Sequence, residues 1–181
     1  LFDGEQYYPQ GAVVFGPEGI QHISNEDKTP SANHSIDVSG RLIAPGLVDL
    51  HSDALEKCIE IRPGVYFDSE FALHNLDRRV AACGITTFCH AISFADAELG
   101  LRSSEEAEKL VRLIRSFSYR DMGTVNHRIH ARFEIGADVG LKILIRILNE
   151  GFVDVLSIMD HTPGQGQFKS WRSFSDYWKG T

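Results

Sequence analysis

The sequence predicts an α/β protein in which residues 42–181 form a parallel sheet with crossover helices and residues 1–41 form part of a small β domain. Two observations support this. From Arg41 onward, apolar strand-like runs alternate with amphipathic helix-like runs, which is the pattern of βα units. Before Arg41, short stretches with strand character are separated by Gly, Pro and Asn or Asp turn signals.

The amino-terminal region contains three stretches that we expect to be strands. They are "GAVVFG" at 11–16, "GIQHIS" at 19–24 and "SIDVSG" at 35–40. Turn-forming residues flank each stretch, which is typical of short antiparallel strands.

The second region contains about four expected βα units. Its apolar runs predict strands over 42–51, 84–92, 125–135 and 153–160. Between them we expect helices over 68–83, 103–119 and 137–149, the second of which starts with the capping sequence "SSEE". Apolar residues recur at helical spacing in that helix, so one of its faces should pack on the sheet. The polar, aromatic tail 169–181 carries no expected element.

Composition and charge exclude several classes of protein. The 181 residues carry a formal net charge of -7, and Lys and Arg are interspersed with acidic residues instead of forming a basic stripe, so we expect no nucleic-acid partner. We find no apolar run long enough to span a membrane and no signal peptide, and we expect a cytoplasmic protein. The three cysteines, Cys58, Cys83 and Cys89, lack a C-x-x-C spacing and are expected to be buried free thiols.

The first strand of the second region ends in polar residues that share one face. Side chains two apart on a strand point the same way, which groups Leu47, Asp49, His51 and Asp53. Val48 and Leu50 then lie on the opposite face, which we expect to pack against helices. An unpaired carboxylate is costly in a dry core, so the polar face must have another role. In a (β/α) barrel, His51 and Asp53 would lie at the mouth, where catalytic residues cluster.

Two later strands repeat this pattern. On the third strand, the alternate residues that share one face are all polar, namely Arg128, His130, Arg132 and Glu134. The last strand runs into Ser157, Met159 and His161 on one face, followed by a Gly-rich turn. An exposed face held by salt bridges is the alternative explanation for the third strand.

The polar strand ends predict a metal site. A single strand-end His-x-Asp is more often a hydrogen-bonded turn, so the prediction depends on its neighbours. His51, Asp53, Glu134 and His161 supply imidazole and carboxylate ligands from three strand ends. Such ligands bind one or two divalent ions, with Zn, Fe, Mn and Ni all acceptable, and these ions can activate water for hydrolysis.

Cations and amides near these strand ends are candidate substrate contacts. Lys57 and Arg62, in the loop after the first strand, and Arg132 could hold an anionic substrate. Gln165 and Gln167, in "PGQGQ", suit phosphate or sugar oxygens. The alternatives are solvated loop charges and a plain tight turn.

The remaining histidines are weaker candidates. We interpret His74 as a capping or packing residue of a helix. His90 is either a ligand or a core residue, with the core favoured. His22, His34 and His127 are interpreted as structural or exposed.

Five motifs together resemble one protein family. They are "APGLVDLHSD", "RPGV", "AACGITTFCHA", "RIHARFE" and "SIMDHTPGQGQF", and in this order they span almost the whole chain. The sequence resembles the amidohydrolase superfamily, and within it the hydrolases of the carbon–phosphorus lyase pathway. "PGLVDLH" and "GITT" alone would indicate only the superfamily, whereas "MDHTPGQ" with the His-x-Asp start is more specific.

The resemblance implies a (β/α)8 TIM-like barrel beside a small β-sandwich, with a binuclear metal centre at the barrel mouth. By motif, His51 and Asp53 correspond to the first-strand metal pair, which in most of the superfamily is His-x-His. Glu134 corresponds to a bridging carboxylate that replaces a carboxylated lysine, and His161 to a further ligand. Lys57 and Arg62 match cations of the family's first loop. His90 stands where the family has an acidic residue.

The resemblance also implies a function. We expect a metal-dependent hydrolase of phosphonate metabolism that converts the small phosphorylated sugar α-D-ribose 1-methylphosphonate 5-triphosphate to the 5-phosphate and diphosphate. The family's later histidine ligands and its catalytic last-strand aspartate have no counterpart here. The catalytic residue is therefore unknown, and we expect roughly half of an enzyme, inactive as 181 residues alone.

Two other functions stay open from the sequence. One is an amidohydrolase that cleaves a C–N bond of a cyclic amide or imine. The other is an inactive barrel fragment that acts as a binding subunit. The sequence also leaves a homo-oligomer open.

Overall fold

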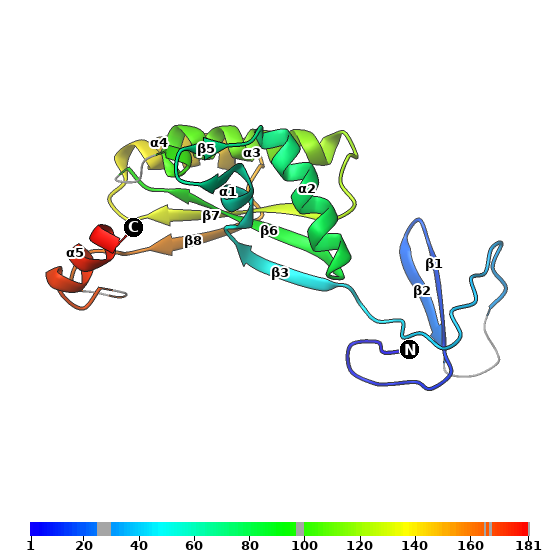
Figure 1. Ribbon diagram of the computed structural model, residues 1–181. Coiled ribbons are helices and arrows are strands. Elements are labelled where there is room, and N and C mark those ends of the chain that lie inside the picture. The colour runs from blue at the N-terminus through cyan, green and yellow to red at the C-terminus, as the bar shows by residue number, and fades with distance from the viewer. Residues whose placement is uncertain (25–29, 97–99, 165, 167, 181) are drawn as a thin grey trace. The chain divides into compact units, whose positions relative to one another are not determined.

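A computed structural model describes residues 1–24, 30–96, 100–164, 166 and 168–180 of the chain (Figure 1). It divides into two compact units, an amino-terminal unit Leu1–Gly46 and a main unit Leu47–Thr181.

The described part of the amino-terminal unit contains an antiparallel hairpin. Strands β1 (Ala12–Gly16) and β2 (Gly19–Ser24) pair as expected for 11–16 and 19–24. The predicted strand at 35–40 is wrong, because these residues have no strand structure. The Asp37 carboxylate accepts hydrogen bonds from both the backbone N–H and the hydroxyl of Ser39, at 2.8 and 2.6 Å. This local turn competes with strand pairing.

The main unit is built on a four-stranded parallel sheet. Its strands are β3 (Leu47–Ser52), β6 (Ile85–Phe94), β7 (Asn126–Glu134) and β8 (Val155–Met159), and they lie side by side in chain order. Helices α2 (Ser69–Ala82), α3 (Ser104–Tyr119) and α4 (Asp138–Asn149) connect them and cover the same face of the sheet (Figure 1). The predicted parallel α/β architecture of the main unit is confirmed.

Local sequence signals set the ends of these helices. The Asp68 carboxylate caps α2 by accepting from the Phe71 N–H at 2.9 Å, and Ser103 caps α3 through the Glu106 N–H at 3.4 Å. Gly84 and Gly151 follow α2 and α4 with φ of 79° and 72°. This left-handed conformation ends a helix, and glycine adopts it without the steric strain that a Cβ would cause.

Several shorter elements were not predicted. After β3 come helix α1 (Ala54–Ile59) and a hairpin of β4 (Glu60–Arg62) and β5 (Val65–Tyr66). A 3-10 turn, η1 (Gly100–Arg102), follows β6, and helix α5 (Trp171–Gly180) forms in the tail. The predicted loop after the first strand is therefore a helix and a hairpin.

The core of the main unit lies between the helices and one face of the sheet. Phe88, Ile92 and Phe94 of β6 are buried against apolar residues of α3, including Ile114 and Phe117. Ile129 and Ala131 of β7 are also fully buried, as the predicted alternation requires. His90 belongs to this core face and is itself completely buried, so the favoured core interpretation is confirmed.

The two outer strands expose apolar side chains. Val48 and Leu50 on β3 are 58% and 63% exposed, and Leu156 and Ile158 on β8 are also exposed. The prediction that Val48 and Leu50 pack against helices is wrong for the described residues. The reason is that β3 is an edge strand of the sheet, while α2 packs mainly on α1 and β6.

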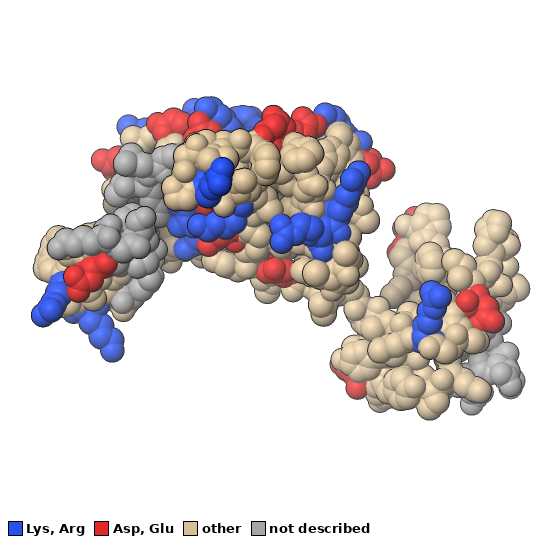
Figure 2. Space-filling model, viewed as in Figure 1, with Lys and Arg blue, Asp and Glu red and all other residues tan. Residues whose placement is uncertain are grey.

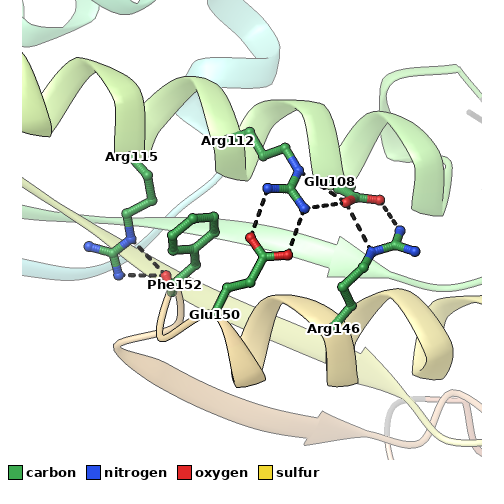
Figure 3. A network of polar contacts seen from close by, with 6 residues as sticks. All are labelled: Glu108, Arg112, Arg115, Arg146, Glu150 and Phe152. Carbon is green, nitrogen blue, oxygen red and sulfur yellow. Dashed lines mark hydrogen bonds and ion pairs between the residues drawn. The ribbon is translucent and has the colours of Figure 1, made fainter.

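Ion pairs join α3 to α4 on the outer surface (Figure 3). Arg112 binds Glu108 and Glu150, each at 2.8 Å, and Glu108 also pairs with Arg146. Figure 2 shows acidic and basic side chains interspersed over these helices. Burial raises the pKa of Glu108, but the hydrogen bonds from Arg146 and Arg112 outweigh it and lower the pKa. The network holds the two helices in register.

Across the described residues, the helices are all too short or too polar to span a membrane.

Candidate functional site

The candidate site lies on the sheet face opposite the helices, toward the carboxyl ends of the strands. On this face β6 contributes the small residues Ala91 and Ser93, which align with His130 and Arg132 of β7. Small side chains on β6 let the longer side chains of β7 cross that strand and reach β3. Polar groups from strands that are not neighbours in the sheet thereby come into contact.

His130 links the two outer strands. Its Nδ1 lies 3.0 Å from the Leu50 carbonyl oxygen on β3, and its Nε2 lies 3.0 Å from the Ser157 hydroxyl on β8. A carbonyl oxygen can only accept, so Nδ1 carries the hydrogen, and Nε2 of the neutral ring accepts from Ser157. The ring also contacts His51 edge-on, with centroids 5.2 Å apart. His130 therefore positions β3, β8 and His51.

Glu134 holds His161 through both carboxylate oxygens. Oε2 accepts from Nδ1 of His161 at 2.6 Å, and Oε1 accepts from the His161 backbone N–H at 2.8 Å. Because Nδ1 donates, Nε2 of the neutral His161 ring carries a lone pair. A carboxylate that orients a histidine in this way is the usual support of a metal-ligating imidazole.

Asp53 lies between two arginines. Its Oδ1 is 3.4 Å from Nη1 of Arg132, and its Oδ2 is 3.6 Å from Nη2 of Arg102 in η1. Arg102 also donates from Nε to Glu56 of α1 at 2.7 Å. The Glu56 side chain is only 8% exposed, so this second pair is the better shielded of the two.

The four predicted metal ligands are brought to the same edge of the sheet but not into one cluster. Glu134 and His161 touch, Asp53 contacts arginines, and exposed His51 packs on His130. In the part of the chain that the structure describes, no three or more His, Cys, Asp or Glu side chains are arranged to hold a metal ion. The donor types suit a divalent ion, whereas the arrangement supplies only pairs. We therefore derive no catalytic step through a metal.

The predicted substrate-binding residues are spread over several elements. Lys57 is exposed on α1, and Arg62 is exposed on β4, so both project from ordered structure next to the strand end. Arg132 reaches Asp53 as described above. Gln165 and Gln167 lie outside the described residues.

The segment after His161 is held by aromatic contacts. Phe168, which is 6% exposed, lies between His161 and Phe174 of α5, with ring centroids 6.0 and 5.2 Å away. Trp171 contacts Phe174 in turn, at 5.9 Å. Helix α5 is thus connected to the candidate site through Phe168.

A second polar cluster lies on the opposite, helix-covered face. Asp77 of α2 accepts from the backbone N–H groups of Thr124 and Val125, each at 2.9 Å, and from Nε2 of His127 at 3.1 Å. Nδ1 of His127 then accepts from Nε2 of His90 at 2.8 Å. Burial lowers the pKa of both histidines, and Asp77 opposes this only at His127. This cluster is structural, and the interpretation of His127 as a structural residue is confirmed.

Other predicted details have mixed outcomes. His74 packs edge-on against Phe117 with centroids 4.7 Å apart, which confirms a packing role. The cysteines are free as expected, but only Cys89 is buried, whereas Cys83 is exposed at the end of α2. Burial raises the pKa of the Cys89 thiol.

Sequence reasoning missed two residues of this site. His130 was placed on the polar face but given no role, although its parity with Arg132 and Glu134 indicated that it faces the site. Arg102 was not singled out, because it lies in a turn with no periodic pattern and comes close to Asp53 only through the fold.

Comparison with known proteins gives one similar protein. The chain is 31% identical over 177 residues to the α-D-ribose 1-methylphosphonate 5-triphosphate diphosphatase of Escherichia coli (strain K12). The match covers 94% of this chain and 46% of that protein, so the chain spans about half of its relative's length. No family model and no solved structure matches. The identity supports a relationship to this diphosphatase.

Proposed function

We propose that this chain is part of a metal-dependent hydrolase of phosphonate metabolism. Its substrate would be α-D-ribose 1-methylphosphonate 5-triphosphate, which water would cleave to the 5-phosphate and diphosphate. The observation that carries the proposal is the 31% identity over 94% of the chain to a diphosphatase whose name states this substrate. The geometry adds that imidazoles, carboxylates and arginines meet at the carboxyl edge of a parallel sheet, where enzymes of this architecture place their sites.

The fold supports the first half of a (β/α)8 barrel. The four parallel strands follow chain order, and their helices lie on one face, as in the wall of such a barrel. The apolar residues exposed on β3 and β8 are those that further strands and helices would cover. In this proposal the hairpin unit belongs to the accompanying β-sandwich.

The chain's own residues would bind and orient the triphosphate. Lys57, Arg62 and Arg132 would offset its negative charge, together with Gln165 and Gln167 as hydrogen-bond donors. Water attacks the α-phosphorus, the bond to the bridging oxygen breaks, and diphosphate leaves with that oxygen. Arg132 lies on β7 itself, and its side chain reaches Asp53.

The proposed metal ligands are His51, Asp53, Glu134 and His161. One or two divalent ions would supply a Lewis acid and an acidic bound water. His161 is the best prepared ligand, because Glu134 fixes its ring. Since the described residues form only pairs, further ligands or a rearrangement of Asp53 would be needed to complete the site.

A panel assay tests the proposal. The full-length protein, purified without chelator, is analysed for bound metal and assayed for diphosphate release from the ribose triphosphate, with lactams and cyclic imines as alternative substrates. We expect at least about one metal per chain and diphosphate release. Hydrolysis of only the C–N substrates would support a cyclic amidohydrolase instead. A protein without metal and without activity on any substrate would support a binding subunit.

A further inference from the structure

We propose that His130 is a positioning residue of the candidate site, because its Nδ1–H group supports a bulge in β3 that directs His51 toward the site. The inference rests on the proposed function in one respect, since it takes His51 to be a residue of that site. It goes beyond the proposed function by giving a role to a histidine that lies in the middle of β7 and not at a strand end.

A bulge interrupts the pairing of β3 with β6 just before the site. The register shifts between Asp49 and Ser52, where β3 has one residue more than the facing stretch of β6. Leu50 and His51 form this bulge. Bulges change the direction of a side chain and are common beside active sites. The direction of His51 therefore depends on what holds the bulge in place.

Side chains bind two backbone groups of the bulge. The Leu50 carbonyl oxygen accepts from Nδ1 of His130 at 3.0 Å, and the His51 backbone N–H donates to Oδ1 of Asp49, also at 3.0 Å. Backbone groups that leave the strand ladder need such partners, because an unpaired polar group is costly once it is shielded from water. The contact from Asp49 closes the bulge locally. The contact from His130 comes from another strand and ties the bulge to β7.

Ser157 fixes the hydrogen of His130 on Nδ1. Its hydroxyl lies 3.0 Å from Nε2 and donates to the lone pair of that nitrogen. A hydrogen bond at one ring nitrogen thus sets the tautomer that the other nitrogen presents. The imidazole is buried, and its aligned neighbour on β6 is the small residue Ala91. One ring therefore connects β8 and β7 with the bulge in β3.

The same ring contacts the side chain that the bulge presents. His51 packs edge-on against His130, with ring centroids 5.2 Å apart. His130 thus holds His51 in two ways, through the carbonyl of the preceding residue and through the imidazole. A displacement of about 1 Å near a reacting centre can lower a rate by about a hundredfold. Loss of this support should therefore lower kcat more than it raises KM.

Two amide variants of His130 separate positioning from packing. In His130→Asn the side-chain NH₂ lies at the position of Nδ1 and can still donate to the Leu50 carbonyl. In His130→Gln it lies near the position of Nε2 and cannot, although glutamine is closer to histidine in size. We expect His130→Asn to keep most of the kcat for diphosphate release by the full-length protein, and His130→Gln to lower it by about tenfold to a hundredfold. A packing role alone predicts the opposite order.

Two further measurements follow the bulge itself in the full-length protein. Nitrogen-15 NMR of the histidine rings shows which nitrogen of His130 carries the hydrogen, and amide hydrogen exchange shows how well the His51 N–H is protected. We expect exchange at His51 to be about tenfold faster in His130→Gln, because a hydrogen bond that holds the bulge is lost, and close to wild type in His130→Asn.

Ser157→Ala tests the tautomer, and Ser118→Ala is its matched control. We expect Ser157→Ala to reduce the fraction of His130 that carries its hydrogen on Nδ1. Ser118 also has a hydroxyl in a 3.0 Å hydrogen bond, which it donates to the Ile114 carbonyl within α3, so its removal should leave the His130 tautomer unchanged.

Two results would overturn the inference. One is a His130 ring with its hydrogen on Nε2 in the wild type. The other is a His130→Gln variant that equals or exceeds His130→Asn in kcat and in protection of the His51 N–H. Thermal unfolding shows which variants are folded. If the two His130 variants are not, Ser157→Ala decides, with faster exchange at His51 and a lower kcat supporting the inference and wild-type values contradicting it.

Failure of the function and failure of the inference are distinguishable. If the wild type releases no diphosphate, the proposed function is refuted, and the ring tautomer and the exchange at His51 still decide whether His130 supports the bulge. If the wild type releases diphosphate and both His130 variants keep its kcat, the proposed function stands and the inference is overturned.

Discussion

Nδ1 of His161 donates to Oε2 of Glu134 across 2.6 Å, while the other oxygen of Glu134 accepts the His161 backbone N–H. The second residue past β8 is thus fixed by the last residue of β7. This contact sets both the path of the chain after β8 and the orientation of an imidazole whose Nε2 can bind a metal.

Glu134→Gln tests the role of this contact. Glutamine keeps the shape and can accept one of the two hydrogen bonds, but it lacks the charge that supports the ring. We expect the affinity for Zn²⁺ to fall by about tenfold or more, and the metal content with it, because the change affects both a proposed ligand and the support of the His161 ring. Elemental analysis after dialysis against a defined Zn²⁺ concentration measures this. Glu150→Gln, on the outer surface, is the control and should keep its metal. Unchanged metal binding in Glu134→Gln would limit Glu134 to a structural role.

His51→Ala tests whether the first strand takes part in the metal site. His51 is exposed and its ring makes an edge-on contact with His130, so its removal should change the free energy of unfolding by less than about 1 kcal/mol. We expect loss of metal and of diphosphate release despite this small effect. Calorimetric unfolding and metal analysis on the same preparation separate the effect on stability from the effect on metal binding. Full activity and metal content in His51→Ala would show that His51 is not a metal ligand.

The buried histidine pair predicts acid sensitivity. Burial lowers the pKa of His90 and of His127 below the unfolded value, which is about 6.5. The unfolded chain therefore binds more protons, and the free energy of unfolding falls as the pH drops below about 6.5 toward the folded pKa values.

Urea unfolding at a series of pH values between 7.5 and 5 measures this effect. His90→Phe removes one of the two groups, so its stability should fall less steeply over this range than that of the wild type. His22→Phe, which removes an exposed imidazole, is the matched control. Equal slopes for wild type and His90→Phe would contradict the prediction.

Asp77→Asn tests the anchor of the same cluster. The carboxylate accepts two backbone N–H groups and the His127 ring while almost fully buried. Asparagine would place its amide NH₂ group, which can only donate, against one of these N–H groups and leave that N–H without an acceptor. We expect a loss of roughly 3 kcal/mol in the free energy of unfolding. Chemical denaturation at pH 7.5 measures it. A loss below about 0.5 kcal/mol, typical of a surface change, would show that these bonds are not needed.

The sequence predicted the main sheet well and its surroundings less well. Polar and apolar residues alternate along β7 from Arg128 to Glu134, and the helices carry recognisable caps at Asp68 and Ser103. Helix α1 and the β4–β5 hairpin are too short to show a period. The stretch 35–40 has strand-forming residues, but the local turn at Asp37 prevails, and none of the strands that the structure describes pairs with it.

The candidate site was predicted in residue type more than in arrangement. Parity placed Arg132 and Glu134 on one face, and the contact between Glu134 and His161 follows from neighbouring strand ends. The contact of Arg132 with Asp53 was not foreseeable, since it depends on small residues of β6 lying between them. Predicting which side chains meet across an intervening strand requires the register of the strand pairs, and the sequence pattern does not contain that register.

The most direct test is hydrolysis of α-D-ribose 1-methylphosphonate 5-triphosphate by the full-length protein in ¹⁸O-labelled water, followed by phosphorus NMR and mass spectrometry. We predict diphosphate and the ribose 5-phosphate as products, with the label in the 5-phosphate, because water attacks the α-phosphorus. No diphosphate, or label in the diphosphate, would contradict the proposed reaction.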